Sequence, residues 1–235
     1  MRKILMAATA GLLMASTVQA QKRETIEGNG KIITRDVKVS SFNSLKASGI
    51  YELKLSQGNT EAVKIEADEN LQDLFQVHND GEKLVIEMKK MENKSFNNKT
   101  KLKVYVTFKN LKEMELSTIG NVASEEQLSF GDLDLKNKSV GNVNLELTAS
   151  KIDIKNTSVG NVHLSGKADN ATVKNSGVGS IEAGNFVVQT MDIENTGVGH
   201  AEVNAAKNLK VKDSFLGKVR NKGAAATKRM NTVKV

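Results

Sequence analysis

Two aspartates in consecutive copies of a repeat are the residues of this chain best suited to catalysis. Asp134 and Asp153 take the same place in the matching segments LDLKN and IDIKN. If these segments are strands stacked in register, the two carboxylates lie about 5 Å apart, near the separation of a retaining glycosidase pair. Polysaccharide lyases with a β-helix fold also place acidic groups and a base on such a face. A carbohydrate-active β-helix enzyme, either a lyase or a hydrolase, is therefore one hypothesis for this chain.

Lysines on the same face offer a second explanation. A lysine follows each aspartate by two residues, and the next copy of the repeat keeps this lysine. Residues two apart on a strand share a face, so the charges neutralise one another without any catalytic role. We therefore expect a candidate binding face without catalytic residues, formed by Asp134, Lys136, Asp153, Lys155 and Lys174.

Other signatures of catalysis or metal binding are missing from the sequence. His163 and His200 occupy different positions of the repeat, so they would not stack into a metal site. The chain has no cysteine, no GxSxG, no HExxH and no phosphate-binding glycine loop. We expect no catalytic, cofactor-binding or metal-binding residue, and no cofactor.

The aspartates belong to a repeat whose clearest marker is a glycine. Gly141, Gly160, Gly179, Gly199 and Gly217 recur at a nearly constant spacing. The copies read LDLKNKSVGNVNL, IDIKNTSVGNVHL, ATVKNSGVGSIEA, MDIENTGVGHAEV and LKVKDSFLGKVRN. A repeat this short cannot bury its own apolar side, so it must stack on further copies of itself. A degenerate copy around Gly120 is interpreted as the first coil, and all six glycines are expected at a bend of the backbone.

Aligning the copies on this glycine produces columns of like residues. Four residues before it stand Asn137, Asn156, Asn175, Asn195 and Asp213, which predict a buried ladder of side-chain hydrogen bonds. One residue before it stand Val140, Val159, Val178, Val198 and Leu216, and we expect this column, with the other apolar columns, to form the core.

The repeat period of about 20 residues fits a β-helix or a leucine-rich repeat. A leucine-rich repeat needs a second, helical arm, whereas the segments between the glycines alternate with period two, and no amphipathic helix is indicated from residue 102 to 235. The predicted fold is all-β, a β-helix-like solenoid of about 19-residue coils preceded by a β-rich N-terminal region. Strands are expected there at 32–39, 50–56, 62–67, 84–88 and 102–108, with a helical turn at 69–75 and a polar loop at 90–100.

The start of the chain, from Met1 to Ala20, is typical of a signal peptide. Arg2 and Lys3 precede a short apolar run from Ile4 to Met14, and Val18-Gln19-Ala20 fits a cleavage site. We expect cleavage before Gln21, no transmembrane segment afterwards, and a location in the periplasm, at the cell surface or outside the cell. The predicted organisation is a signal peptide at 1–20, a β-rich part at 21–110, the solenoid at 111–222 and a basic C-terminal tail at 223–235.

Charge and composition limit the candidate partners. The chain carries 34 Lys and Arg against 27 Asp and Glu, and its aromatic content is 4%. Few aromatic residues argue against stacking on the bases of a nucleic acid, so no nucleic-acid partner is expected. A basic balance outside the cytoplasm fits an anionic glycan or an envelope protein. The sequence leaves the oligomeric state open.

Particular motifs resemble the head GIN domain family, which is described as adhesin heads of autotransporters and is common in secreted bacterial proteins. The resemblance covers about residues 39–222. It rests on Phe42, Leu45, Ser48-Gly49, Tyr51-x-Leu53, Gly58, Val63-x-Ile65-Glu66-Ala67 and Leu84-x-Ile86, and on the bends Ser176-Gly177-Val178-Gly179 and Thr196-Gly197-Val198-Gly199. It implies a β-helical fold and an envelope or surface location, and it supplies no catalytic residues.

The sequence therefore favours a non-catalytic exported envelope or surface protein that binds a glycan or a protein through the faces of its solenoid. Two alternatives remain open. One is the carbohydrate-active enzyme, and the other is a structural periplasmic protein without a specific ligand.

Overall fold

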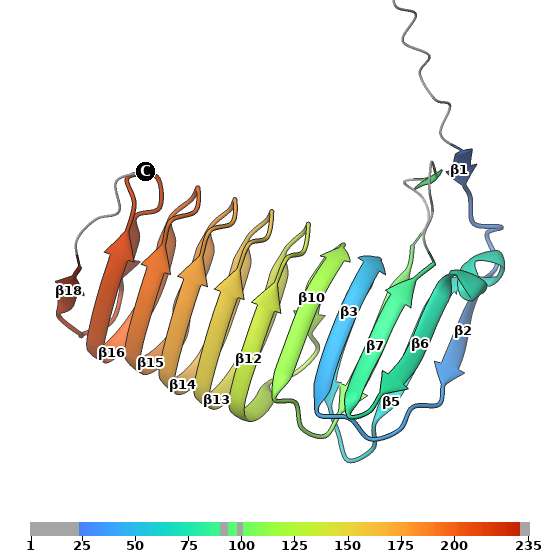
Figure 1. Cartoon of the computed structure of the whole chain (residues 1–235), viewed down its shortest axis with the longest axis horizontal. Helices are drawn as coiled ribbons and strands as arrows, with labels where there is room; N and C mark the ends of the chain where they lie inside the picture. Colours follow the sequence, from blue (N-terminus) through green and yellow to red (C-terminus); the bar gives the residue numbers. More distant parts are fainter. Residues whose placement is uncertain (1–23, 90–93, 98–100, 231–235) are drawn as a thin grey trace, which may run out of the picture.

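The protein forms a long, nearly all-β solenoid (Figure 1), as the repeat predicts. The computed structural model describes residues 24–89, 94–97 and 101–230. The predicted signal peptide lies outside the described residues. Within the described part of the chain, no helix is long and apolar enough to cross a membrane.

Each complete coil contributes strands to two faces of the solenoid. The first face begins with four strands, β7 (Lys83–Met88), β3 (Ser44–Ile50), β10 (Glu113–Ile119) and β12 (Leu128–Asn137). It continues with the second halves of four long strands, which are β13 (Val143–Asn156), β14 (Val162–Asn175), β15 (Ile181–Asn195) and β16 (Ala201–Asp213). It ends with β18 (Thr227–Arg229). The second face contains β9 (Lys103–Phe108), β4 (Glu52–Gln57), β11 (Val122–Ser124), the first halves of β13 to β16, and β17 (Val219–Asn221). Neighbouring strands of the stack run parallel, so each coil lies directly over the next.

The register follows the glycine-based alignment closely. Asp134 pairs with Asp153, Asn137 with Asn156, and Val143 with Val162. The register shifts between His163 and Ser165 where β14 meets β15, and again along β15 where it meets β16. These irregularities accommodate the unequal spacing of the bend glycines, because an extra residue in one coil must leave the ladder somewhere.

The stack extends further toward the N-terminus than the sequence indicates. Every residue of β3 pairs in parallel with β10, and β7 pairs with the other edge of β3. The degenerate copy around Gly120 is therefore not the first coil, and this interpretation was wrong. Residues 44–57 and parts of residues 83–108 form two coils beneath it. They enter the stack out of chain order, since β3 lies between β7 and β10.

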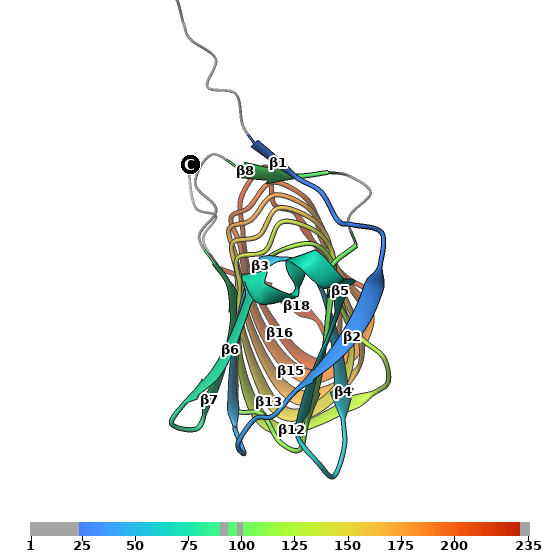
Figure 2. The same cartoon turned by 90° about the vertical axis from the view of Figure 1, so that its right-hand side faces the viewer.

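Antiparallel strands and one short helix close the N-terminal end (Figure 2). β2 (Ile32–Val37) pairs with β5 (Ala62–Asp68), and β6 (Phe75–Asp80) pairs with β7. The predicted helical turn is the 3₁₀ helix η1 (Glu69–Leu74), whose Leu71 is buried in the core. The loop predicted at 90–100 contains β8 (Lys94–Phe96), which pairs with β1 (Glu24–Ile26).

Inward-facing apolar columns fill the solenoid. The column six residues before the glycine is at most 4% exposed, and it comprises Leu135, Ile154, Val173, Ile193 and Val211.

The column directly before the glycine was predicted to join this core, and that prediction was wrong. Val140, Val159, Val178 and Val198 are 48% to 52% exposed and pair only as isolated bridges along one edge of the solenoid. The cause is strict alternation, because Asn137 and Ser139 point inward and Val140 must then point outward.

The prediction of a basic C-terminal tail beginning at residue 223 was wrong, because residues 223–230 belong to the folded solenoid. β18 pairs with Leu209–Val211 of β16, and Ala225 is buried. Both β17 and β18 pair with β16, so they form the last described layer of the solenoid. The remaining residues, 231–235, lie outside the described residues.

Candidate functional site

The asparagine column forms a buried ladder of side chains. Each side-chain nitrogen donates to the next side-chain oxygen, at 2.8 Å from Asn137 to Asn156, 2.8 Å from Asn156 to Asn175 and 2.7 Å from Asn175 to Asn195. All four side chains are nearly inaccessible to solvent. The oxygens also hold the bend, since Asn137 accepts from the Ser139 amide. These residues therefore position the coils and are not available to a ligand.

The ladder changes at its C-terminal end. Asn195 donates to the carbonyl oxygens of Gly199 and Gly217 instead of to Asp213. Asp213 accepts from the Val219 amide at 3.1 Å and pairs with Arg229 of β18. Burial opposes the negative charge of Asp213, but the Arg229 guanidinium beside it lowers the pKa of that carboxyl. A buried carboxylate is stable here because it has both a cation and a backbone donor.

The bend glycines fall into two groups. Gly120, Gly141, Gly160, Gly179 and Gly199 have φ between +127° and +141°, where side chains are strained. A Cβ on each would also meet the backbone of the coil beneath it. Gly217 also lies at a bend, where a Cβ would meet the carbonyl oxygens of Asn195 and Gly197, but it is not among the described glycines with positive φ. In this last turn β17 has only three residues, and Asp213 takes the place of the ladder asparagine.

A second ladder, on the outside of the bend, was missed in the sequence. The oxygens of Asn121, Asn142 and Asn161 accept from the backbone amides of Asn142, Asn161 and Ser180 at 2.9 to 3.0 Å. The available signal was the recurring Gly-Asn dipeptide at 120–121, 141–142 and 160–161. This outer ladder and the buried ladder form hydrogen bonds on the two sides of the bend. Both therefore serve to stack the coils along this edge of the solenoid.

The structure brings the two aspartates of the candidate binding face together in register. Each lies near a lysine. Lys151 contacts Asp153 at 2.7 Å, while Lys136 contacts Glu113 at 2.7 Å and approaches Asp134 to 3.8 Å. The hydrogen bond from Lys151 lowers the pKa of Asp153. A retaining glycosidase needs one carboxyl that stays protonated, so this shift runs against an acid role for Asp153.

The other lysines of this face differ in their pairing. Lys155 and Lys174 lie one above the other in the register, both exposed, and neither forms a salt bridge with a described residue. Two coils further along the same column, Lys212 pairs with Glu194 at 2.7 Å. The middle of the first face is therefore a small cationic strip between charge-paired regions.

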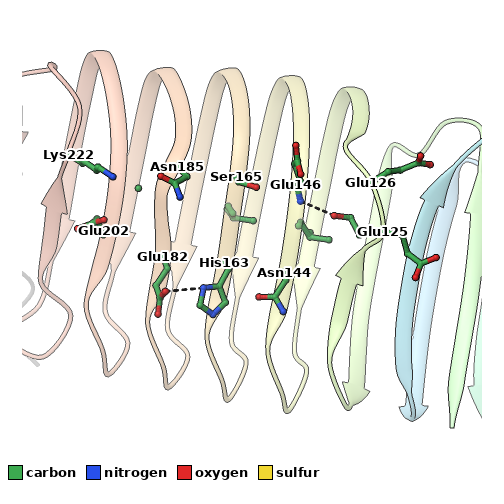
Figure 3. Close-up of a pocket in the computed structure, with 14 residues that line it drawn as sticks. Glu125, Glu126, Asn144, Glu146, His163, Ser165, Glu182, Asn185, Glu202 and Lys222 are labelled. Carbon is green, nitrogen blue, oxygen red and sulfur yellow. Dashed lines mark hydrogen bonds and ion pairs between the residues drawn. The ribbon is translucent and has the colours of Figure 1, made fainter. Parts of the chain in front are cut away.

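A polar recess lies on the opposite, second face (Figure 3). This groove of about 400 Å³ crosses several coils between Ser124 and Lys222. Its labelled side chains come from neighbouring coils and line one continuous surface. Small residues at Ser124, Ser165 and Gly184 leave room between the longer side chains. The register of β14 on β15 shifts at this place, which separates the side chains that would otherwise stack.

Carboxylates dominate the lining of the groove. The glutamates that line it are Glu125, Glu126, Glu146, Glu182 and Glu202, against the basic residues His163 and Lys222. His163 lies 3.0 Å from Glu182, and Arg220 lies 3.7 Å from Glu202. Within the described residues, no group of three or more acidic, histidine or cysteine side chains has a metal-binding arrangement. The groove is therefore a mostly acidic surface that extends over several coils.

No motif of the sequence points to this groove. Its central column, three residues after the bend glycine, reads Asn144, His163, Glu182 and Glu202, and those types share no obvious chemistry. Glu125 and Glu126 come from outside the regular repeat. Only the stacked register and the local bulge bring these side chains onto one surface.

Several solved structures are similar to this chain. A structure described as "putative adhesin" from Bacteroides fragilis is 28% identical, covers 87% of this chain and 100% of its own, and has a TM-score of 0.74. A second "putative adhesin", from Parabacteroides merdae, is 23% identical, covers 88% of this chain and 95% of its own, and has a TM-score of 0.62. No match was found among curated proteins.

The family comparison agrees with the motifs and with the fold. The model of the family described as "Putative auto-transporter adhesin, head GIN domain" matches residues 41–225. This range begins just before β3 and ends between β17 and β18, so it spans the stack of parallel coils except for its last strand. The chain is a member of the head GIN domain family.

Proposed function

We propose that this protein is a non-catalytic exported protein that binds a basic segment of an envelope protein through the groove on its second face. The observation that carries this proposal is the groove lining, in which five glutamates face one lysine and one histidine. Complementary charge steers a cationic partner to such a surface and suppresses anionic ones. The adhesin description of the family and of its solved relatives supports a binding role and an exported location.

The chemistry of the groove favours a protein partner over a sugar. Among the described residues that line it there is no Phe, Tyr or Trp, whose flat apolar rings would suit a sugar. An extended segment with alternating Lys or Arg could instead place successive cations against Glu146, Glu182 and Glu202. Catalysis has less support, because the pKa of Asp153 is lowered and the described lining of the groove holds no paired nucleophile and base.

Titration of the exported chain with a decalysine peptide tests the proposal by calorimetry. Glu146→Gln combined with Glu182→Gln should weaken binding about 10-fold, because two charges near the ligand are lost. Asp132→Asn combined with Asp192→Asn is the matched control, since it removes two carboxylates from the first face and should change affinity less than about 2-fold. Equal weakening in both variants would show nonspecific attraction and would contradict a site in the groove.

The natural partner can be identified from the same surface. A photo-crosslinking residue at position 165, in the lining of the groove, should trap a partner in exporting cells, and mass spectrometry should name it. The same residue at position 174 on the first face is the control. A partner trapped equally from both positions would not be a ligand of the groove.

The cationic strip supports a second candidate function. Lys155 and Lys174 have no salt bridge with a described residue, which fits an anionic glycan on the first face. Binding of polygalacturonate that is weakened by Lys155→Gln with Lys174→Gln, and unchanged by the two groove substitutions, would support this candidate over the first.

A further inference from the structure

The last coil carries a strongly unbalanced charge. Between residues 207 and 230 the sequence has eight basic residues and one acidic residue, Asp213. The basic residues are Lys207, Lys210, Lys212, Lys218, Arg220, Lys222, Lys228 and Arg229. Asp213 is buried and already pairs with Arg229, so it does not reduce the positive potential of the surface by much.

Most of these cations form no salt bridge with a described residue. Lys212 pairs with Glu194 and Arg220 approaches Glu202, both on earlier coils. The other five lysines are exposed, and none forms a salt bridge within the part of the chain that the structure describes. We call this surface, formed by residues 207–230, the basic end.

The basic end also exposes large apolar side chains. Phe215 is 83% exposed, Leu216 is 61% exposed and Met230 is 53% exposed. Phe215 and Leu216 follow shortly after β16, and the amide of Met230 donates to the Val211 carbonyl near the end of the same strand. The three side chains therefore belong to one corner of the last coil, together with Lys218.

We propose that the basic end docks on a lipid bilayer that contains anionic lipids. Its lysines would meet the headgroups, while Phe215, Leu216 and Met230 would enter the boundary with the acyl chains. Clusters of lysine attract anionic membrane surfaces, and exposed aromatic and aliphatic side chains add binding by leaving water. The opposite end of the solenoid is closed by η1 and the antiparallel strands, so the two ends differ (Figure 1).

The same features argue against the other occupants of this surface. A second copy meeting the same corner would bring a like positive charge, which opposes association. A soluble anionic glycan would satisfy the lysines but would leave Phe215 and Leu216 in water. A membrane matches both the charge and the apolar corner. The inference does not depend on the proposed groove, because Lys222 alone belongs to both surfaces.

Co-sedimentation with vesicles tests the proposal. The exported chain should bind vesicles made of one part phosphatidylglycerol and two parts phosphatidylcholine, and should bind pure phosphatidylcholine vesicles far more weakly. Lys210→Gln with Lys218→Gln and Lys228→Gln should lower binding about 100-fold, at roughly 5-fold per lysine. Lys46→Gln with Lys64→Gln and Lys138→Gln is the matched control, because it removes three exposed lysines from outside the basic end and the cationic strip and should lower binding less than about 3-fold.

A second variant separates lipid from glycan. Phe215→Ser with Leu216→Ser should lower vesicle binding about 10-fold and leave binding to soluble polygalacturonate unchanged. All substituted side chains are exposed, and unchanged thermal melting checks that the variants fold. Absence of binding to the anionic vesicles would overturn the proposal. Equal losses of vesicle binding in the triple-lysine variant of the basic end and in its control would also overturn it. So would vesicle binding that does not change when Phe215 and Leu216 are replaced. A homodimer that is seen in sedimentation equilibrium and dissociates in the Phe215, Leu216 double variant would overturn it as well.

Discussion

The side-chain nitrogen of Asn156 lies 2.8 Å from the side-chain oxygen of Asn175, one coil further along the solenoid. The oxygen of Asn156 accepts in turn from Asn137, and also from the Ser158 hydroxyl. Asn156 is 4% exposed and Asn175 is 2% exposed. Each middle member of the ladder thus satisfies two neighbours that water cannot reach.

Replacing this middle member should destabilise the fold. Asn156→Leu removes a donor and an acceptor and leaves the Asn137 amide without its partner, so it should lower the free energy of unfolding by about 1–3 kcal/mol. Lys155→Ala, one residue away and exposed, should change it by less than about 0.5 kcal/mol. Denaturant unfolding of both variants measures the difference, and equal stability would contradict a stabilising role for the ladder.

The bend glycines should tolerate no side chain. At Gly160 φ is +131°, and a Cβ would press on the Gly141 carbonyl of the coil beneath. Gly160→Ala should therefore lower the free energy of unfolding by about 3 kcal/mol or more, from backbone strain and overpacking together. Gly131→Ala is the control, because nothing lies within 4 Å of a Cβ there, and it should change stability by less than about 1 kcal/mol. A thermal melt in which both variants match the parent protein would exclude the steric argument.

Glu113 should contribute stability that depends on pH. Its hydrogen bond from Lys136, with a further one from Ser44, lowers the pKa of Glu113 to about 2. Because the folded pKa lies below the unfolded value, the contribution is fully present above about pH 5 and is lost as the pH falls through about 2. Glu113→Gln should cost about 1–3 kcal/mol at pH 7 and progressively less toward pH 2.

Urea unfolding at pH 7, 4 and 2.5 measures this trend. Asp192→Asn is the control, since Asp192 is exposed and has no salt bridge within the described residues, and it should cost less than about 0.5 kcal/mol at pH 7. A Glu113→Gln deficit that stays constant from pH 7 to 2.5 would rule out the ionised carboxylate as its source.

The purified protein should release no products from acidic or neutral polysaccharides. The reason is the charge pairing of the first face, where Lys151 lies 2.7 Å from Asp153 and lowers its pKa. Assays of reducing ends and of unsaturated products measure turnover, and Asp153→Asn is the control for contaminating activity. Product release that disappears in Asp153→Asn would establish an enzyme and refute the non-catalytic proposal.

Export should remove residues 1–20. The signal pattern ends at Val18-Gln19-Ala20, so the N-terminal residue of the exported protein should be Gln21. Intact mass and N-terminal peptide analysis of protein recovered from producing cells read the cleavage point directly. Retention of Met1 on the exported chain would indicate an uncleaved anchor instead.

The repeat alone determined the solenoid and its buried ladder. Period-two alternation fixes which side chains of a strand point inward, and a constant spacing fixes which residue lies above which. The positions of Asn137, Asn156, Asn175 and Asn195 follow from these two facts. The same alternation, counted from Asn137, would have placed Val140 outside, and assigning the valine column by hydrophobicity alone caused that error.

Only the tertiary structure decided the features that do not belong to the sequence repeat. β3 pairs with β10 although Leu45 and Met114 are far apart in sequence, and such pairing between unlike segments leaves no period to detect. The acidic groove coincides with a register shift near Ser165 and Gly184 that no local pattern announces. Arg229 reaches Asp213 only because β18 folds back beside β16. Periodicity encodes contacts between equivalent residues, whereas contacts between unlike residues depend on how the whole chain packs.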